Sequence, residues 1–170
     1  MPISMTFAAD LATAPARVEA LPEWNLADLY TAMDSPALAA DMEKADALCK
    51  AFEDSYKGKL AGLLADADGG EKLAAAVRAY EEIDDLLGRI ASYGSLIYAG
   101  DTSDPVRAKF YGDIQERLTD ASTHLLFFTL EMNHLDDGAL DAAMAVPALG
   151  HYRPWLEDLR TDKPYQLDDK

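Results

Sequence analysis

Three histidines are the side chains of this 170-residue sequence best suited to bind a transition metal or move a proton: His124, His134 and His151. None is followed by glutamate, so the His-Glu-x-x-His motif, in which two histidines hold zinc and the glutamate activates water, is absent. Glu131 and His134 form a Glu-x-x-His unit, which di-iron helical bundles use twice, but it occurs once here. Asp120, four residues before His124, supplies no second copy. His134 is therefore expected to be an exposed residue in the last turn of a helix.

A second group with chemical potential is acidic and suggests either acid–base catalysis or a cation site. It comprises Glu81, Glu82, Asp84 and Asp85. Helical spacing spreads these four positions around the helix axis, which favours a solvated surface over a convergent site.

Four tyrosines are candidates for the wall of a peptide-binding groove: Tyr93, Tyr98, Tyr111 and Tyr152. Aromatic residues at helical spacing more often pack in a core. The only cysteine, Cys49, lies on an apolar helical stripe and is expected to be a packed thiol.

No Ser–His–acid set, phosphate-binding loop or dinucleotide fingerprint is recognisable in the sequence. We therefore predict no catalytic residue, no cofactor-binding residue and no metal ligand in this chain. Fifteen basic against 31 acidic residues give a net charge of −16, which argues against nucleic-acid and anionic-membrane partners. No apolar run reaches the 18 or so residues that cross a bilayer, and residues 1–20 lack a basic signal-peptide start. A soluble, cytoplasmic protein is expected.

The elements that must position these side chains are helical. Apolar residues recur at steps of three or four and predict three long helices near residues 36–66, 71–99 and 105–135. Ser35-Pro36 and Asp104-Pro105 each place a capping side chain before a proline, as helix starts do. The short turn at 101–104 makes the second and third helices an antiparallel hairpin.

Shorter elements flank the long helices. Asn25 is expected to cap a short helix packed beside Trp24, and further short helices are expected near 139–145 and 152–160. No alternating strand pattern occurs. The predicted fold is all-α, an antiparallel bundle of three long helices with short flanking helices and no sheet. Residues 1–20 are expected to be a mobile arm before a helical domain at 21–170.

The run from Leu125 to Leu130 is apolar on nearly every side of its helix, so several neighbours must cover it. In this chain alone part of that face, with Phe127 and Phe128, is expected to be exposed. A homodimer through this face and residues 152–159 is the expected consequence.

Three stretches carry a family resemblance. The first is Trp24–Tyr30, which reads WNLADLY and is similar to a family opening of the form W-[DN]-L-x-D-L-Y. The second comprises 80–83, 92–94 and 101–105, and the third is 151–160 followed by 163–167. Together they resemble the start of oligoendopeptidase F, in the thimet-oligopeptidase-like family of zinc metallopeptidases.

The resemblance implies an all-helical zinc endopeptidase that cuts short peptides inside a deep channel. The family's zinc ligands cannot be assigned to any residue of this chain, which resembles only the N-terminal helical part. The expected role is a wall of the channel in a larger peptidase, inactive alone, with zinc bound elsewhere in the parent protein. Two alternatives stay open, a free-standing helical interaction module and a metal-binding bundle that would need a second Glu-x-x-His.

Overall fold

Every regular element in residues 24–165, the part of the chain that the computed structural model describes, is helical. The predicted all-α class is confirmed, and the expected mobile arm at 1–20 lies outside the described residues. None of the described helices is long and apolar enough to cross a membrane. In chain order the elements are α1 (Pro36–Tyr56), α2 (Leu60–Ala65), α3 (Gly69–Gly100), α4 (Pro105–Thr123), α5 (Leu126–His134), α6 (Asp137–Ala143), α7 (Pro147–Gly150), α8 (Arg153–Leu159) and the 3₁₀ helix η1 (Arg160–Tyr165).

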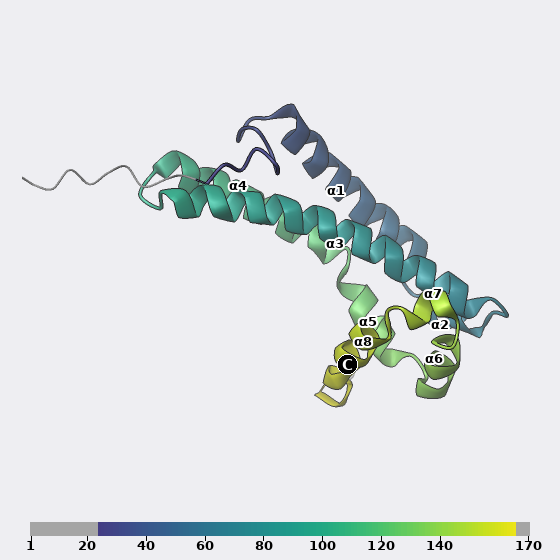
Figure 1. Cartoon of the computed structure of the whole chain (residues 1–170). Coiled ribbons are helices and arrows are strands. Elements are labelled where there is room, and N and C mark those ends of the chain that lie inside the picture. The colour runs from purple at the N-terminus through teal and green to yellow at the C-terminus, as the bar shows by residue number, and fades with distance from the viewer. Residues whose placement is uncertain (1–23, 166–170) are drawn as a thin grey trace, which may run out of the picture.

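The long hairpin of α3 and α4 is the backbone of the fold (Figure 1). Asp104 caps α4, because its Oδ1 accepts a hydrogen bond from the Val106 N–H at 2.7 Å, and Pro105 occupies the first turn as predicted. Gly94 lets the two helices approach closely, since a Cβ there would lie 3.0 Å from Ile114 Cδ1. The Asp104 cap thus determines where α4 begins, and Gly94 allows the close contact between α3 and α4.

The prediction of one helix over 36–66 is wrong, because α1 ends at Tyr56 and α2 begins at Leu60. Gly58 lies between them with φ +74°, a left-handed conformation that ends a helix. Its N–H donates to Glu131 Oε1 at 2.6 Å. A contact from α5 therefore supports the break.

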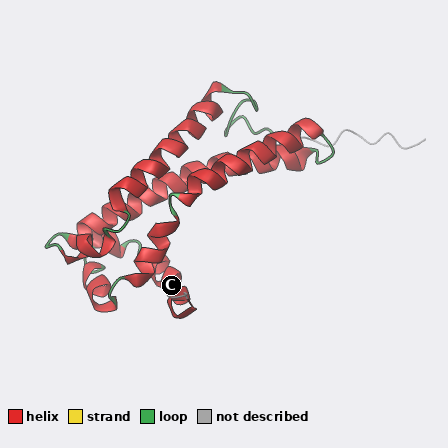
Figure 2. Ribbon diagram, turned by 180° about the vertical axis from the view of Figure 1, so that it is seen from behind, coloured by secondary structure: helices red, strands yellow, loops and turns green. Residues whose placement is uncertain are grey.

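The predicted helix over 105–135 is also divided. Helix α4 ends at Thr123, and α5 leaves the hairpin in a new direction (Figure 2). Phe128 drives this change, because it is fully buried against α1 and α3. Its ring meets Phe52 edge-on with centroids 5.1 Å apart and stacks on Tyr80 at 4.9 Å.

The short helices α6, α7 and α8 gather with α2 and α5 at the end of the hairpin where α3 begins (Figure 1). Leu140, Leu149 and Leu156 anchor them in the core, each with at most 1% of its surface exposed. The helix expected after Asn25 is a hydrogen-bonded turn instead, in which Tyr30 N–H bonds the Leu26 carbonyl at 3.1 Å.

Helix α1 contacts both helices of the hairpin, since Asp41 pairs with Arg89 of α3 at 3.5 Å and Asp46 with Arg117 of α4 at 3.0 Å, and it diverges from the hairpin toward its N-terminal end (Figures 1 and 2). Between that end and α4 lie two adjoining hollows of about 500 and 640 Å³, which we call the α1–α4 groove. Both are lined by Met33, Asp34, Phe110 and Asp113.

Candidate functional site

A pocket of about 300 Å³ lies between α3 and the C-terminal segment. We call it the aromatic–acidic pocket. Its lining residues are Val77, Tyr80, Glu81, Asp84 and Asp85 of α3, with Tyr152 and Trp155.

Helical periodicity brings the α3 residues of this pocket together. Positions 77, 80–81 and 84–85 recur at steps of three or four and share one face of α3. Of the acidic group that was expected to be spread around the axis, Glu81, Asp84 and Asp85 lie on this face and line the pocket, whereas Glu82 does not. The opposite wall comes from Tyr152, which precedes α8, and from Trp155 in its first turn. Leu156 fixes α8 in place because its side chain is fully buried. Two segments far apart in sequence therefore build one site.

A hydrogen bond joins the two walls. The Tyr152 hydroxyl donates to Glu81 Oε2 at 2.7 Å, across 71 residues of sequence. This bond raises the pKa of Tyr152 above its ordinary value, with Glu81 the principal cause. The tyrosine therefore stays protonated at neutral pH and holds the Glu81 carboxylate in one orientation.

The rings of the pocket continue into the aromatic core. The Trp155 and Tyr80 ring centroids lie 6.0 Å apart at 34°, and Tyr80 stacks on buried Phe128. Burial raises the pKa of Tyr80, and the negative charge of Asp84 adds to the effect. The aromatic wall is thus part of a packed cluster.

The carboxylates of the pocket are not neutralised by ion pairs among the described residues. Asp84 and Asp85 are exposed and form none there, and Glu81 accepts its hydrogen bond from a neutral hydroxyl. Arg78 and Glu82 are the charged α3 neighbours whose fields reach Tyr152. They act in opposite directions on its pKa.

The structure separates the histidines that sequence analysis considered. His124 pairs with Glu53 where α4 meets α5, whereas His134 is exposed at the end of α5, as expected. Glu131 binds the Gly58 backbone instead of acting with His134. Within residues 24–165, no group of three or more His, Cys, Asp or Glu side chains is placed to hold a metal ion.

The four tyrosines do not form one groove. Tyr93 is buried against Tyr30, with ring centroids 5.2 Å apart, and Tyr98 stacks on Tyr111 across the hairpin. Of the four, Tyr152 alone lines the aromatic–acidic pocket. The core packing expected for such residues is confirmed for Tyr93.

The expectation of a packed thiol is also confirmed. Cys49 is fully buried, and burial raises the pKa of its thiol to about 11.

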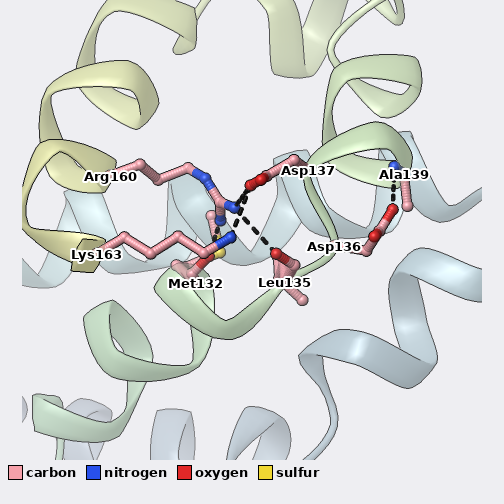
Figure 3. Close-up of polar contacts among 7 residues, drawn as sticks. All are labelled: Met132, Leu135, Asp136, Asp137, Ala139, Arg160 and Lys163. Carbon is pink, nitrogen blue, oxygen red and sulfur yellow. Dashed lines mark hydrogen bonds and ion pairs between the residues drawn. The ribbon is translucent and has the colours of Figure 1, made fainter. Parts of the chain in front are cut away.

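The contacts that hold the C-terminal segment in place were not predictable from the sequence (Figure 3). The Arg160 guanidinium donates to the carbonyl oxygens of Met132 and, at 2.9 Å, Leu135, and it also binds Asp137. Lys163 Nζ contacts the same Asp137 oxygen at 2.7 Å. Arg160 therefore closes the C-terminal end of α5, where carbonyls lack helical partners. No local spacing rule links a cation to a helix end 25 residues earlier.

The family model for the N-terminal region of M3 peptidases, described as oligopeptidase F, matches residues 131–170. Residues 131–170 are therefore similar to the N-terminal region of oligopeptidase F. Comparison with curated proteins and with solved structures gives no match.

The oligopeptidase F-like segment contains both the Arg160 contacts and one wall of the pocket. Tyr152 and Trp155 lie within the matched residues, whereas the acidic wall on α3 precedes them. The part of the resemblance expected at 151–160 and 163–167 is therefore confirmed by the match.

Proposed function

We propose that this chain is the helical N-terminal portion of a zinc-dependent oligoendopeptidase that hydrolyses short peptides. The observation that carries the proposal is the oligopeptidase F match over residues 131–170. The all-helical architecture supports it, because the same resemblance implies an all-helical enzyme. In this proposal the parent protein is cytoplasmic.

The proposed role is structural within the enzyme. The chain forms part of the wall of the substrate channel, while the zinc ligands and the glutamate that activates water belong to another part of the parent protein. An elongated hairpin with a packed cluster at one end suits this role, since it is a rigid scaffold with a hollowed surface.

Two measurements test the proposal: the reading frame of the gene past Lys170 and the peptidase activity of its product. We expect the reading frame to continue past Lys170 to a His-Glu-x-x-His motif, and the longer product to cleave an internally quenched nonapeptide in a chelator-sensitive way. The purified 170-residue chain, supplied with zinc, should show no turnover. A stop codon directly after Lys170, or chelator-sensitive turnover by the short chain, would contradict the proposal.

A free-standing helical interaction module is the alternative, and the α1–α4 groove is the observation that favours it. The groove is open and includes Val106, whose side chain is 62% exposed. A stop codon after Lys170 would favour this alternative over the peptidase portion.

A further inference from the structure

We infer that the aromatic–acidic pocket binds the arginine side chain of a peptide through its guanidinium group. The inference deepens the proposed function by naming a substrate class. It concerns binding to this chain alone, so it is testable without any catalytic activity.

The pocket carries a concentration of negative charge. Glu81, Asp84 and Asp85 place three carboxylates around one opening, with no ion pair from another described residue. A hollow with low-dielectric walls concentrates such a field and raises the local concentration of cations. The net charge of −16 adds a long-range attraction for basic peptides.

The aromatic wall of the pocket is a second feature that favours a cationic side chain. Tyr80 and Trp155 lie side by side at 34°, and Tyr152 is the third ring of the wall. Aromatic faces attract organic cations through their quadrupoles, with tryptophan the strongest and arginine the most frequent partner. An arginine side chain also has an apolar stem, which Val77 and the rings would cover.

The arrangement of the carboxylates suits an organic cation better than a metal ion. Metal ions require several oxygen ligands within about 2.0–2.6 Å of one point, and the described carboxylates form no such group. Carboxylates spread around about 300 Å³ suit a broad, delocalised charge instead. This volume is at the lower end of the range for ligand sites, which fits one side chain.

Two side chains of the pocket are held in place before a ligand enters. The Tyr152–Glu81 hydrogen bond fixes one carboxylate, and Tyr80 is fixed by its stacking on buried Phe128. Little side-chain freedom is then lost when a ligand enters.

The chain supplies its own reporter for the test. Trp24 and Trp155 are the two tryptophans of the sequence, and Trp24 is 77% exposed outside the pocket. In a Trp24→Phe background, the fluorescence therefore reports on Trp155. The probes are blocked tripeptides, acetyl-Ala-Arg-Ala-amide and its citrulline analogue, which has nearly the same shape but no charge. We expect a saturable fluorescence change with the arginine peptide and at least tenfold weaker binding of the citrulline peptide.

Paired variants locate the binding. Asp84→Asn with Asp85→Asn should weaken binding of the arginine peptide about tenfold. Asp28→Asn with Asp120→Asn changes the net charge equally at exposed positions outside the pocket and should change binding less than twofold. Circular dichroism checks that each variant keeps its helical content.

Equal binding of the two peptides, or no saturable binding, would overturn the inference. An equal loss in the two double variants would also overturn it, because general charge attraction would then explain the binding. If folding is perturbed by the double change, Glu81→Gln alone provides the same comparison against Glu82→Gln. Failure here would leave the family match intact, and failure of peptide turnover would leave this binding measurement unaffected.

Discussion

At the scale of single residues, Arg160 joins the C-terminal segment to two other helices. Its side chain is only 12% exposed and binds two carbonyls at the end of α5 as well as Asp137 on α6. A guanidinium has several donors in a fixed plane, so one residue can satisfy acceptors from separate elements. The C-terminal segment thereby stays folded against α5.

Replacing Arg160 should destabilise the protein. We expect Arg160→Met to lower the free energy of unfolding by about 1.5–3 kcal/mol, because hydrogen bonds from a charged group are lost and buried carbonyls lose their partner. Urea denaturation measures the change. Arg153→Met is the matched control, since Arg153 is 43% exposed and its one ion pair within residues 24–165 is with Glu157 at 3.4 Å. Its effect should stay within about 1 kcal/mol. Equal effects of the two variants would contradict the capping role.

Asp137 predicts an acid dependence. Its bonds to Lys163 and Arg160 lower the pKa of the carboxyl below the ordinary value of 3.8. A lowered folded-state pKa gives stability that is present above the unfolded value and is lost as pH falls through the folded value. Asp137→Asn should therefore lower the thermal midpoint at pH 7, and this difference should shrink below pH 3.8. A difference that grows as the pH falls would refute the assignment.

At the scale of elements, the helix starts with a capping side chain and a proline were predictable, and the helix breaks were not. The starts depend on neighbouring residues, as Asp104 and Ser35 show, since each caps a helix whose first residue is proline. The break after Thr123 depends instead on the burial of Phe128 among α1 and α3, which no local pattern contains. The break at Gly58 is similar, because Glu131 from α5 supports it.

The two caps should contribute measurably to stability. Asp104→Ala and Ser35→Ala should each cost about 0.5–2 kcal/mol, because a helix N–H loses its acceptor. The bonds concerned are Asp104 to Val106 N–H at 2.7 Å and Ser35 to Leu38 N–H at 3.3 Å. Chemical denaturation is the measurement, with Ser103→Ala as a control in the same turn. An unchanged midpoint for Asp104→Ala would contradict the cap.

Gly58 should resist substitution although space is available. A Cβ there would meet nothing within 4 Å, so the cost of Gly58→Ala comes from its φ of +74°. We expect about 1–2 kcal/mol of destabilisation. Gly62→Ala, inside α2 and equally uncrowded, should instead be neutral or stabilising. Similar denaturation midpoints for the two variants would show that the break between α1 and α2 is not maintained by this residue.

At the scale of the whole molecule, residues from both walls of the aromatic–acidic pocket were candidates from the sequence, but their proximity was not predicted. The acidic group on α3 and Tyr152 were separate candidates, and Glu81 and Tyr152 are separated by 71 positions in the sequence. Their meeting follows from the fold-back of α8, which Leu156 and Arg160 secure. Tertiary contacts of this kind have no periodic signature in the sequence.

The expected exposed face of Leu125–Leu130 is largely covered within the chain. Phe127 and Phe128 are buried, with 8% and 0% of their surfaces exposed, so they cannot form the dimer surface that was expected. Phe128→Asp should therefore cost more than about 3 kcal/mol of folding stability, because a large core side chain is lost and a charge is buried. Leu126 and Leu130 keep 62% and 50% of their surfaces exposed.

The homodimer thus stays a prediction, and it now depends on these two leucines, which lie one turn apart on α5. Fully burying an exposed leucine contributes roughly 1.5–3 kcal/mol. Because about half of each side chain is already covered in the monomer, a symmetric pair of copies would gain roughly 3–7 kcal/mol from four leucines. Association itself costs about 4–15 kcal/mol, and the charge of −16 on each copy opposes it. A weak dimer is expected, visible by sedimentation at tens of micromolar protein and favoured by salt, which screens the repulsion.

Leu126→Asp should give monomers, whereas Val106→Asp, equally exposed at 62% but on α4, should not. Sedimentation that shows only monomer for the unmutated chain at that concentration and high salt would refute the dimer, and the fold-back of Trp155 and Arg160 would then be sufficient cover for α5.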